Sequence, residues 1–186
     1  ASCAEPWFLL PFFRTFVEDA MLADYDHSDC RRATEEFVVN LPNGKADYLK
    51  EIGQMATRLY RLKAGPDARY FLDKTPRYLL IVDDLLEAFP NAKFIVLHRN
   101  PLAVFASMMN TWYGGGFAPY RYEIDLFEGV RKLNELFLSK RENVMNIKYE
   151  DVTRDCGETI NSVSKFLGIN ISRKEFVNGG DKIVGS

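Results

Sequence analysis

Two cationic side chains stand at similar places in this sequence. Lys74 and Arg99 each follow a short apolar stretch, and each is followed two residues later by a proline suited to a first helical turn, Pro76 or Pro101. Arginine presents a planar fork of N–H donors that matches a phosphate group, and lysine presents a mobile point charge. A single arginine after a strand is more often an ordinary surface residue. The repeated arrangement favours a binding site for an anion, to which Ser107 adds a hydroxyl group.

Residues 93–107 contain the elements that must position Arg99. The apolar run at residues 94–97 includes β-branched side chains, which is typical of a buried strand. Asn100, directly after Arg99, is suited to cap a helix. A strand that runs straight into a helix leaves free backbone N–H groups and the positive end of the helix dipole at the carboxyl edge of the sheet, where anions bind. We therefore predict that this segment forms half of a nucleotide site.

Strand and helix patterns alternate from residue 69 onward. Short apolar stretches predict strands at residues 70–72, 94–97 and 143–148, and helical spacing predicts helices at residues 76–89, 101–109, 123–140 and 157–167. This alternation predicts an α/β fold with a parallel sheet flanked by helices. Ligands of such sheets bind beyond the carboxyl ends of the strands. The last of these strands would bring Tyr149 and Glu150 to the same edge as Lys74 and Arg99.

The first third of the chain has a helical pattern. Apolar residues recur at helical spacing between residues 11 and 64, and Gly65-Pro66 supplies a stop signal. We expect one domain over residues 1–186, with a helical cover at about 1–68 and a strand–helix nucleotide-binding core at about 69–186. A chain of this length buries about 70% of its unfolded surface. Because residue 1 is not a methionine, we expect a truncated domain whose start lies upstream.

The composition argues against several classes of protein. Hydrophobic residues make up 47% and aromatic residues 13% of the chain, as in a globular protein, and a formal net charge of −2 argues against wholesale nucleic-acid binding. Three widely spaced cysteines form neither a disulfide framework nor a metal cluster, which indicates a reducing compartment or buried thiols. We expect no metal and favour a cytoplasmic location. No apolar run approaches the roughly 20 residues that span a bilayer.

The motifs around the two cations resemble those of one enzyme family. Arg99-Asn100-Pro101, Ala103-Val104 and Ser107 are similar to the 3′-phosphate-binding segment of sulfotransferases, which use 3′-phosphoadenosine-5′-phosphosulfate as sulfuryl donor. Lys74-Thr75-Pro76 and residues 89–95 look like the same family. This part is nearer to the carbohydrate and tyrosylprotein branches and their bacterial relatives than to the cytosolic small-molecule branch.

The resemblance implies a fold and a set of roles. The fold would be the P-loop-nucleotide-hydrolase-like fold of sulfotransferases. Arg99 and Ser107 would hold the 3′-phosphate, and Lys74 would stabilise charge on the transferring group and the leaving phosphate. Tyr149-Glu150-Asp151 resembles the next strand end of the family, whose tyrosine contacts the nucleotide in the tyrosylprotein branch. The implied reaction moves a sulfuryl group to a hydroxyl or amine of an unidentified acceptor.

Two further assignments follow from the resemblance near the ends of the chain. The acceptor must lose a proton to a general base. Pro76 occupies the place of the histidine of the cytosolic branch, and Glu5 matches the glutamate base of the tyrosylprotein branch. Lys182 lies in a segment, residues 180–186, that resembles the start of the late cofactor loop. The Gly-rich phosphosulfate loop of the family, expected before Glu5, is absent from this sequence, as is the pattern G-x-x-x-x-G-K-[ST].

Other interpretations of these residues stay open. The alternatives are an ion pair with Asp73 for Lys74, a bond to its own helix backbone for Ser107, a helix-entry carboxylate for Glu5 and a core position for Tyr149. The chain could also be a non-catalytic nucleotide-binding or scaffolding module of the same fold. A kinase-like phosphotransferase fits less well because no phosphate loop is visible, and no G-x-G-x-x-G pattern supports a dinucleotide oxidoreductase.

Overall fold

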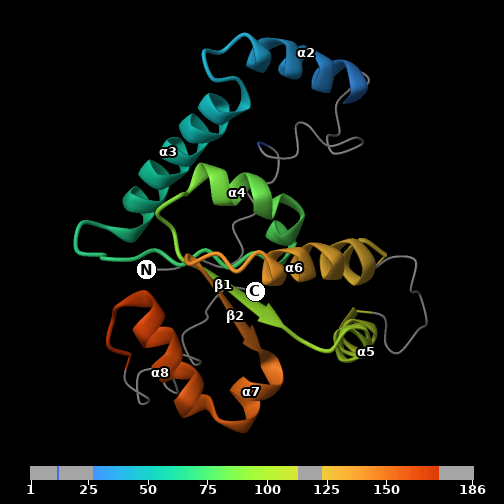
Figure 1. Cartoon of the computed structure of the whole chain (residues 1–186), viewed down its shortest axis with the longest axis vertical. Coiled ribbons are helices and arrows are strands. Elements are labelled where there is room, and N and C mark those ends of the chain that lie inside the picture. Colours follow the sequence, from blue (N-terminus) through green and yellow to red (C-terminus); the bar gives the residue numbers. More distant parts are fainter. Residues whose placement is uncertain (1–11, 13–26, 113–122, 172–186) are drawn as a thin grey trace. The chain divides into compact units, whose positions relative to one another are not determined.

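The computed structural model describes Phe12 and residues 27–112 and 123–171 (Figure 1). The chain divides into two compact units, Ala1–Pro90 and Asn91–Ser186, and each is described by itself. The division falls just before the strand predicted at residues 94–97. The expectation of one domain, with a helical cover and a nucleotide-binding core, stays a prediction.

The first unit is helical in its described part. Its elements are α2 (His27–Val39), α3 (Lys45–Ala64), η2 (Pro76–Ile81) and α4 (Val82–Ala88). The apolar stripe of α3 packs against α4. The buried apolar residues of α3, η2 and α4 are Leu49, Ile52, Ala56, Ile81, Val82, Leu85, Leu86 and Ala88. Helix α3 ends at the predicted stop, where Gly65 adopts a φ of 82°, a conformation that favours glycine.

Helices α3 and α4 approach each other closely at Gly53. A Cβ atom at this position would lie 2.2 Å from the carbonyl oxygen of Ala88. Glycine is therefore required here, because the backbones of the two helices touch. An ion pair supports the same contact, since Lys45 Nζ lies 2.6 Å from Asp84 Oδ1.

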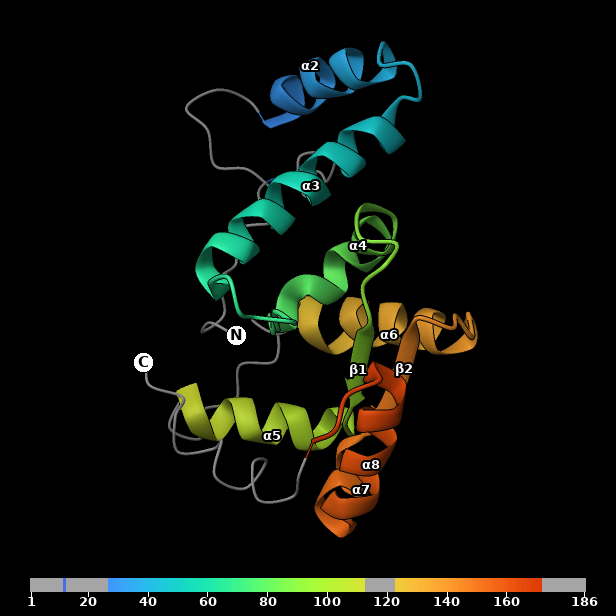
Figure 2. The same ribbon diagram turned by 90° about the vertical axis from the view of Figure 1, so that its left-hand side faces the viewer.

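The second unit contains a parallel strand pair. Its elements are β1 (Phe94–His98), α5 (Pro101–Trp112), η4 (Ile124–Glu128), α6 (Gly129–Leu138), β2 (Val144–Lys148), α7 (Tyr149–Arg154) and α8 (Cys156–Leu167). Strands β1 and β2 run side by side (Figure 2), in a register that pairs Phe94 with Val144 and His98 with Lys148. The predicted α/β class with parallel strands is confirmed. The strands predicted at residues 94–97 and 143–148 correspond to β1 and β2.

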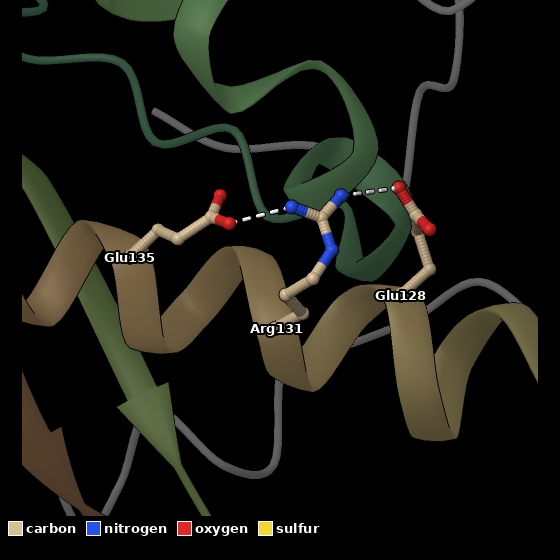
Figure 3. A network of polar contacts seen from close by, with 3 residues as sticks. All are labelled: Glu128, Arg131 and Glu135. Atoms are coloured by element: carbon tan, nitrogen blue, oxygen red, sulfur yellow. Dashed lines mark hydrogen bonds and ion pairs between the residues drawn. The ribbon is translucent and has the colours of Figure 1, made fainter.

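The helix predicted at residues 123–140 is interrupted. Its first part contains a π-helical turn, η4, and the regular α-helix α6 begins at Gly129. Arg131 joins the two parts: its guanidinium lies 2.9 Å from Glu128 and 2.5 Å from Glu135 (Figure 3). All three side chains are about half exposed, so these pairs stabilise the junction only weakly.

The strand predicted at residues 70–72 does not form. Within the described residues this stretch contains only a single β bridge, at Leu72, whose side chain is 62% exposed. Phe71 instead stacks on Tyr60 of α3, with ring centroids 4.5 Å apart. Three residues are too few for apolar content alone to specify a strand when an aromatic partner on a helix is available.

The helix predicted at residues 76–89 begins as a 3-10 helix, η2, and becomes α-helical only at Val82. Thr75 precedes it in an extended conformation, but its side chain makes no capping hydrogen bond. The Thr75 hydroxyl donates to Asp73 Oδ1 at 3.0 Å instead. Threonine before a proline-started helix predicts an N-cap, but Thr75 does not cap η2, because its hydroxyl donates its hydrogen bond to the Asp73 carboxylate.

Candidate functional site

Arg99 and Tyr149 lie next to each other at the carboxyl edge of the strand pair. They are the residues that follow His98 and Lys148, the last pair of the β1–β2 register. The Arg99 guanidinium carbon lies 4.4 Å above the centre of the Tyr149 ring, which is a cation–π contact. Tyr149 is 37% exposed, so a core position for this side chain is wrong. In the described part of the chain the Arg99 guanidinium forms no ion pair within 4.0 Å.

The turn that follows Arg99 is held from both strands. Asn100 Oδ1 accepts the backbone N–H of Leu102 at 2.9 Å, so the predicted cap of α5 is confirmed. The backbone N–H of Asn100 donates to Glu150 Oε1 at 3.2 Å. The pKa of Glu150 is lowered, first by the bond from its own backbone N–H and then by the bond from Asn100, with a smaller effect of the Arg99 charge. Glu150 therefore fastens the start of α5 to the end of β2.

Ser107 lies on α5 and is exposed. It stands two helical turns after Asn100, which places it on the same side of the helix and about 10 Å further along the axis. Its backbone carbonyl accepts the Thr111 hydroxyl at 2.8 Å. In the described residues the Ser107 hydroxyl makes no bond to its own helix backbone, so this alternative is not what the structure shows.

Lys74 belongs to the first unit, where it is exposed and lies just before η2. The residues on either side of it are held by a small polar cluster. Asp73 accepts the Tyr60 hydroxyl through Oδ2 and the Thr75 hydroxyl through Oδ1. Burial and the bond to Asp73 raise the pKa of Tyr60. The tyrosine therefore remains a neutral hydroxyl donor.

Within the second unit the structure brings some of the predicted site residues together. Arg99 and Tyr149 are in contact, and Ser107 follows on the helix that begins beside them. Lys74 is placed only within its own unit. Glu5 and Lys182 lie outside the described residues.

A cleft of about 470 Å³ is present in the second unit, beside the strand pair. His98 lies on its wall, with Nε2 2.8 Å from Asn146 Oδ1 and its ring edge-on to Phe137 at a centroid distance of 5.7 Å. The charged residues lining the cleft carry both signs and include Lys148, Asp151 and Arg154, of which the last two form an ion pair at 2.6 Å. These contacts give His98 a structural role in packing.

Two findings in the described ranges bear on cofactors and membranes. No group of three or more histidine, cysteine, aspartate or glutamate side chains is arranged to hold a metal ion within residues 27–112 and 123–171. None of the helices in these ranges combines the length and apolar content needed to cross a membrane.

Two residues that hold the site have roles that the sequence does not predict. The sequence places Glu150 at the sheet edge, and the structure adds its bond to the Asn100 backbone across the parallel pair. A helical pattern does not predict the role of Tyr60, whose side chain reaches a loop 13 residues later. The one signal in the sequence is a polar aromatic residue on α3 that precedes the aspartate beside Lys74.

Comparisons with known proteins give three matches. A family model described as the sulfotransferase family matches residues 2–173. A segment of 49 residues is 45% identical to nodulation protein NoeE of Sinorhizobium fredii, covering 26% of this chain and 12% of that protein. A sulfotransferase domain from the curacin biosynthetic pathway matches with a TM-score of 0.45 and 18% identity, covering 91% of this chain and 57% of that one. The matches therefore span only part of each relative.

Proposed function

Because the chain belongs to the sulfotransferase family, we propose that it transfers a sulfuryl group from 3′-phosphoadenosine-5′-phosphosulfate to a hydroxyl or amine of an acceptor. Membership confirms the family predicted from the motifs. The resemblance to the carbohydrate and tyrosylprotein branches stays a prediction, as does a cytoplasmic location. Sulfuryl transfer needs in-line placement of donor and acceptor and stabilisation of charge on the transferring and leaving groups.

One observation carries the proposal: the Arg99 guanidinium lies over Tyr149 at the carboxyl ends of two parallel strands. A guanidinium that rests its face on an aromatic ring keeps its in-plane N–H groups available for an anion. The adjoining helix start adds a favourable dipole, while its N–H groups at Asn100 and Leu102 are already bonded to Glu150 and to the Asn100 side chain. In this proposal Arg99 binds the 3′-phosphate and Tyr149 contacts the nucleotide.

Ser107 is the other residue proposed to bind the 3′-phosphate. Its exposed hydroxyl lies on the same side of α5 as Asn100, so a phosphate bound on this side is contacted by both Arg99 and Ser107. The hydroxyl supplies one neutral hydrogen bond, which contributes less than the charge-assisted bonds of Arg99.

The remaining roles complete the proposed transfer. Lys74 stabilises negative charge on the transferring group and the leaving 5′-phosphate. Glu5 takes the proton of the acceptor, and Lys182 contacts the nucleotide late in the chain. Glu5→Gln is expected to lower turnover with a labelled donor far more than nucleotide affinity. Unchanged turnover would remove Glu5 from the mechanism.

Isothermal calorimetry with adenosine 3′,5′-bisphosphate tests the binding half of the proposal. Arg99→Ala is expected to weaken the affinity roughly 30-fold or more, because it removes a charge-assisted pair. Arg154→Ala is the matched control, since Arg154 is an exposed arginine of the same unit that pairs with Asp151. Equal affinities of the parent and Arg99→Ala would refute the 3′-phosphate assignment.

Transfer of label from the donor to hydroxyl and amine acceptors tests the chemical half. Nucleotide binding that depends on Arg99, together with transfer that depends on Lys74, is the expected result. Binding that depends on Arg99 but yields no labelled product with any acceptor would favour a non-catalytic nucleotide-binding module.

A further inference from the structure

The segment that carries Lys74 is held against helix α3 by two kinds of contact. The Phe71 ring stacks on the Tyr60 ring at a centroid distance of 4.5 Å with planes 17° apart. Two residues later, Asp73 accepts the hydroxyl of the same Tyr60. A single side chain of α3 therefore fixes two points of the loop that leads to Lys74, one by packing and one by a charge-assisted hydrogen bond.

The Asp73 carboxylate is engaged at both oxygens. Tyr60 donates to Oδ2, and Thr75, whose side chain is buried with 8% exposure, donates to Oδ1 at 3.0 Å. The two donors come from opposite sides of the aspartate in the sequence, so the backbone is fixed both before and after Lys74. A carboxylate that accepts two hydrogen bonds restrains the loop more than one hydrogen bond would, because each hydrogen bond prevents rotation about the other.

Tyr60 is suited to this role at every ordinary pH. Burial is the main cause that raises its pKa, and the bond to Asp73 adds to it. The hydroxyl therefore keeps its proton and remains a donor. The ring is half-buried, so its bond to the carboxylate is shielded from competing water.

We infer that Tyr60 is a positioning residue of the sulfonucleotide site, which acts through Asp73 to hold Lys74 where its ammonium meets the 5′-phosphate end of the nucleotide. The inference rests on the proposed function, because it takes the role of Lys74 from there. A lysine side chain has many rotamers, and a fixed backbone at its base lowers the entropy lost when the ammonium binds an anion. Tyr60 itself touches no reacting atom.

Two ligands separate positioning from general structural support. Adenosine 3′,5′-bisphosphate has the 5′-phosphate that Lys74 would contact, and adenosine 3′-phosphate lacks it. The ratio of their dissociation constants, measured by calorimetry, therefore reports the 5′ contact alone. Tyr60→Phe, which keeps the stack on Phe71, is expected to reduce the advantage of the bisphosphate roughly three- to tenfold while leaving the affinity for the monophosphate within about twofold.

The variant Lys74→Ala supplies the coupling test. If Tyr60 acts through Lys74, Tyr60→Phe has no further effect on the ratio in the Lys74→Ala background. Tyr48→Phe is the matched control: it removes a hydroxyl from the same helix, one that donates to the Phe12 carbonyl at 3.4 Å, and is expected to leave the ratio unchanged. Thr75→Val, which removes the second donor to Asp73, is expected to move the ratio in the same direction as Tyr60→Phe and serves if the latter fails to fold.

The outcomes distinguish a failure of the positioning role of Tyr60 from a failure of the proposed function. A parent ratio that Tyr60→Phe leaves unchanged, or an equal loss for both ligands, overturns the positioning role of Tyr60 while Lys74 keeps its own. An additive effect in the Lys74→Ala background overturns it as well. A parent that does not prefer the bisphosphate, or a Lys74→Ala variant with the parent ratio, contradicts the proposed function and the inference with it.

Discussion

The two cations of the proposed site are held in different ways. Arg99 is placed by a sheet: the register of β1 and β2 puts it over Tyr149, and Glu150 ties the following turn to the neighbouring strand. Lys74 is placed by a helix: Tyr60 of α3 and Thr75 both bond the aspartate next to it. In each case an acidic residue does the fastening, but the Glu150 side chain is exposed and Asp73 is half-buried.

The two cation positions differ in which mutations can disrupt them. The sheet-held arginine depends on many backbone bonds, so loss of one side chain at its edge leaves the register in place. The helix-held lysine depends on a few side-chain bonds around one partly buried carboxylate. Removing that carboxylate takes away the acceptor of two hydroxyl donors. Burying a donor without its acceptor costs more free energy than the hydrogen bond contributed.

Asp73→Ala gives the largest expected effect on stability. It leaves the hydroxyls of Tyr60 and Thr75 without their acceptor, so the free energy of unfolding is expected to fall by about 3 kcal/mol. Urea denaturation followed by circular dichroism measures it. Glu150→Ala is the counterpart at the other cation, and a loss as large as that of Asp73→Ala would break the contrast between the two positions.

Gly53→Ala tests how strongly the lysine-bearing unit depends on helix packing. The new methyl group would overlap the Ala88 carbonyl, and the free energy of unfolding is expected to fall by about 2 kcal/mol. Gly157→Ala in α8 is the control, because its Cβ would lie 3.4 Å from the nearest atom, Asp155 Oδ1. Similar thermal midpoints for both variants would show that α3 and α4 can separate without cost.

Exchange of the two cations probes the chemistry of each position. Arg99→Lys removes the planar fork that stacks on Tyr149, so the affinity for adenosine 3′,5′-bisphosphate is expected to fall about tenfold. Lys74→Arg keeps a positive charge on an exposed side chain, and a change within about threefold is expected. Calorimetry on both variants measures the difference. The reverse order would mean that the fork is needed at Lys74 instead.

Acid provides the smallest and most local perturbation. The pKa of Glu150 is lowered in the folded chain from its ordinary value of 4.5, so its bond to Asn100 contributes stability above pH 4.5 and this contribution is lost as the pH falls through the lowered value. The difference in thermal midpoint between the parent and Glu150→Gln is therefore expected to shrink below pH 4.5. A difference that stays constant down to pH 3 would exclude the charge of Glu150 as its cause.

Local signals in the sequence predicted much of the arginine half. An apolar run, a capping asparagine and a proline specify the strand–turn–helix around Arg99, and the observed bond from Leu102 to Asn100 confirms the cap. If the two strands are parallel neighbours, their carboxyl ends lie at the same edge of the sheet, which brings Arg99 and Tyr149 close together. The family motifs then supplied roles for these residues, and those roles remain proposals.

The lysine half was less predictable because long-range side-chain contacts decide it. The Tyr60 ring stacks on Phe71, and the Tyr60 hydroxyl donates to Asp73. These contacts override the weak strand signal at residues 70–72. The π-helical turn before Gly129 is not predictable, since the apolar spacing of residues 123–140 runs through it without a break. Helix α7 is not predictable either, because its six residues are too few for a periodic pattern.

The parallel pairing of β1 and β2 has a consequence for the order of folding. Asn100 and Glu150, whose bond fastens the arginine turn, are 50 residues apart in the chain. Closing so long a loop is slow compared with forming α5 or α6. During synthesis the arginine would be made well before its tyrosine, so we expect affinity for the nucleotide to appear in one late step, together with the strand pairing itself.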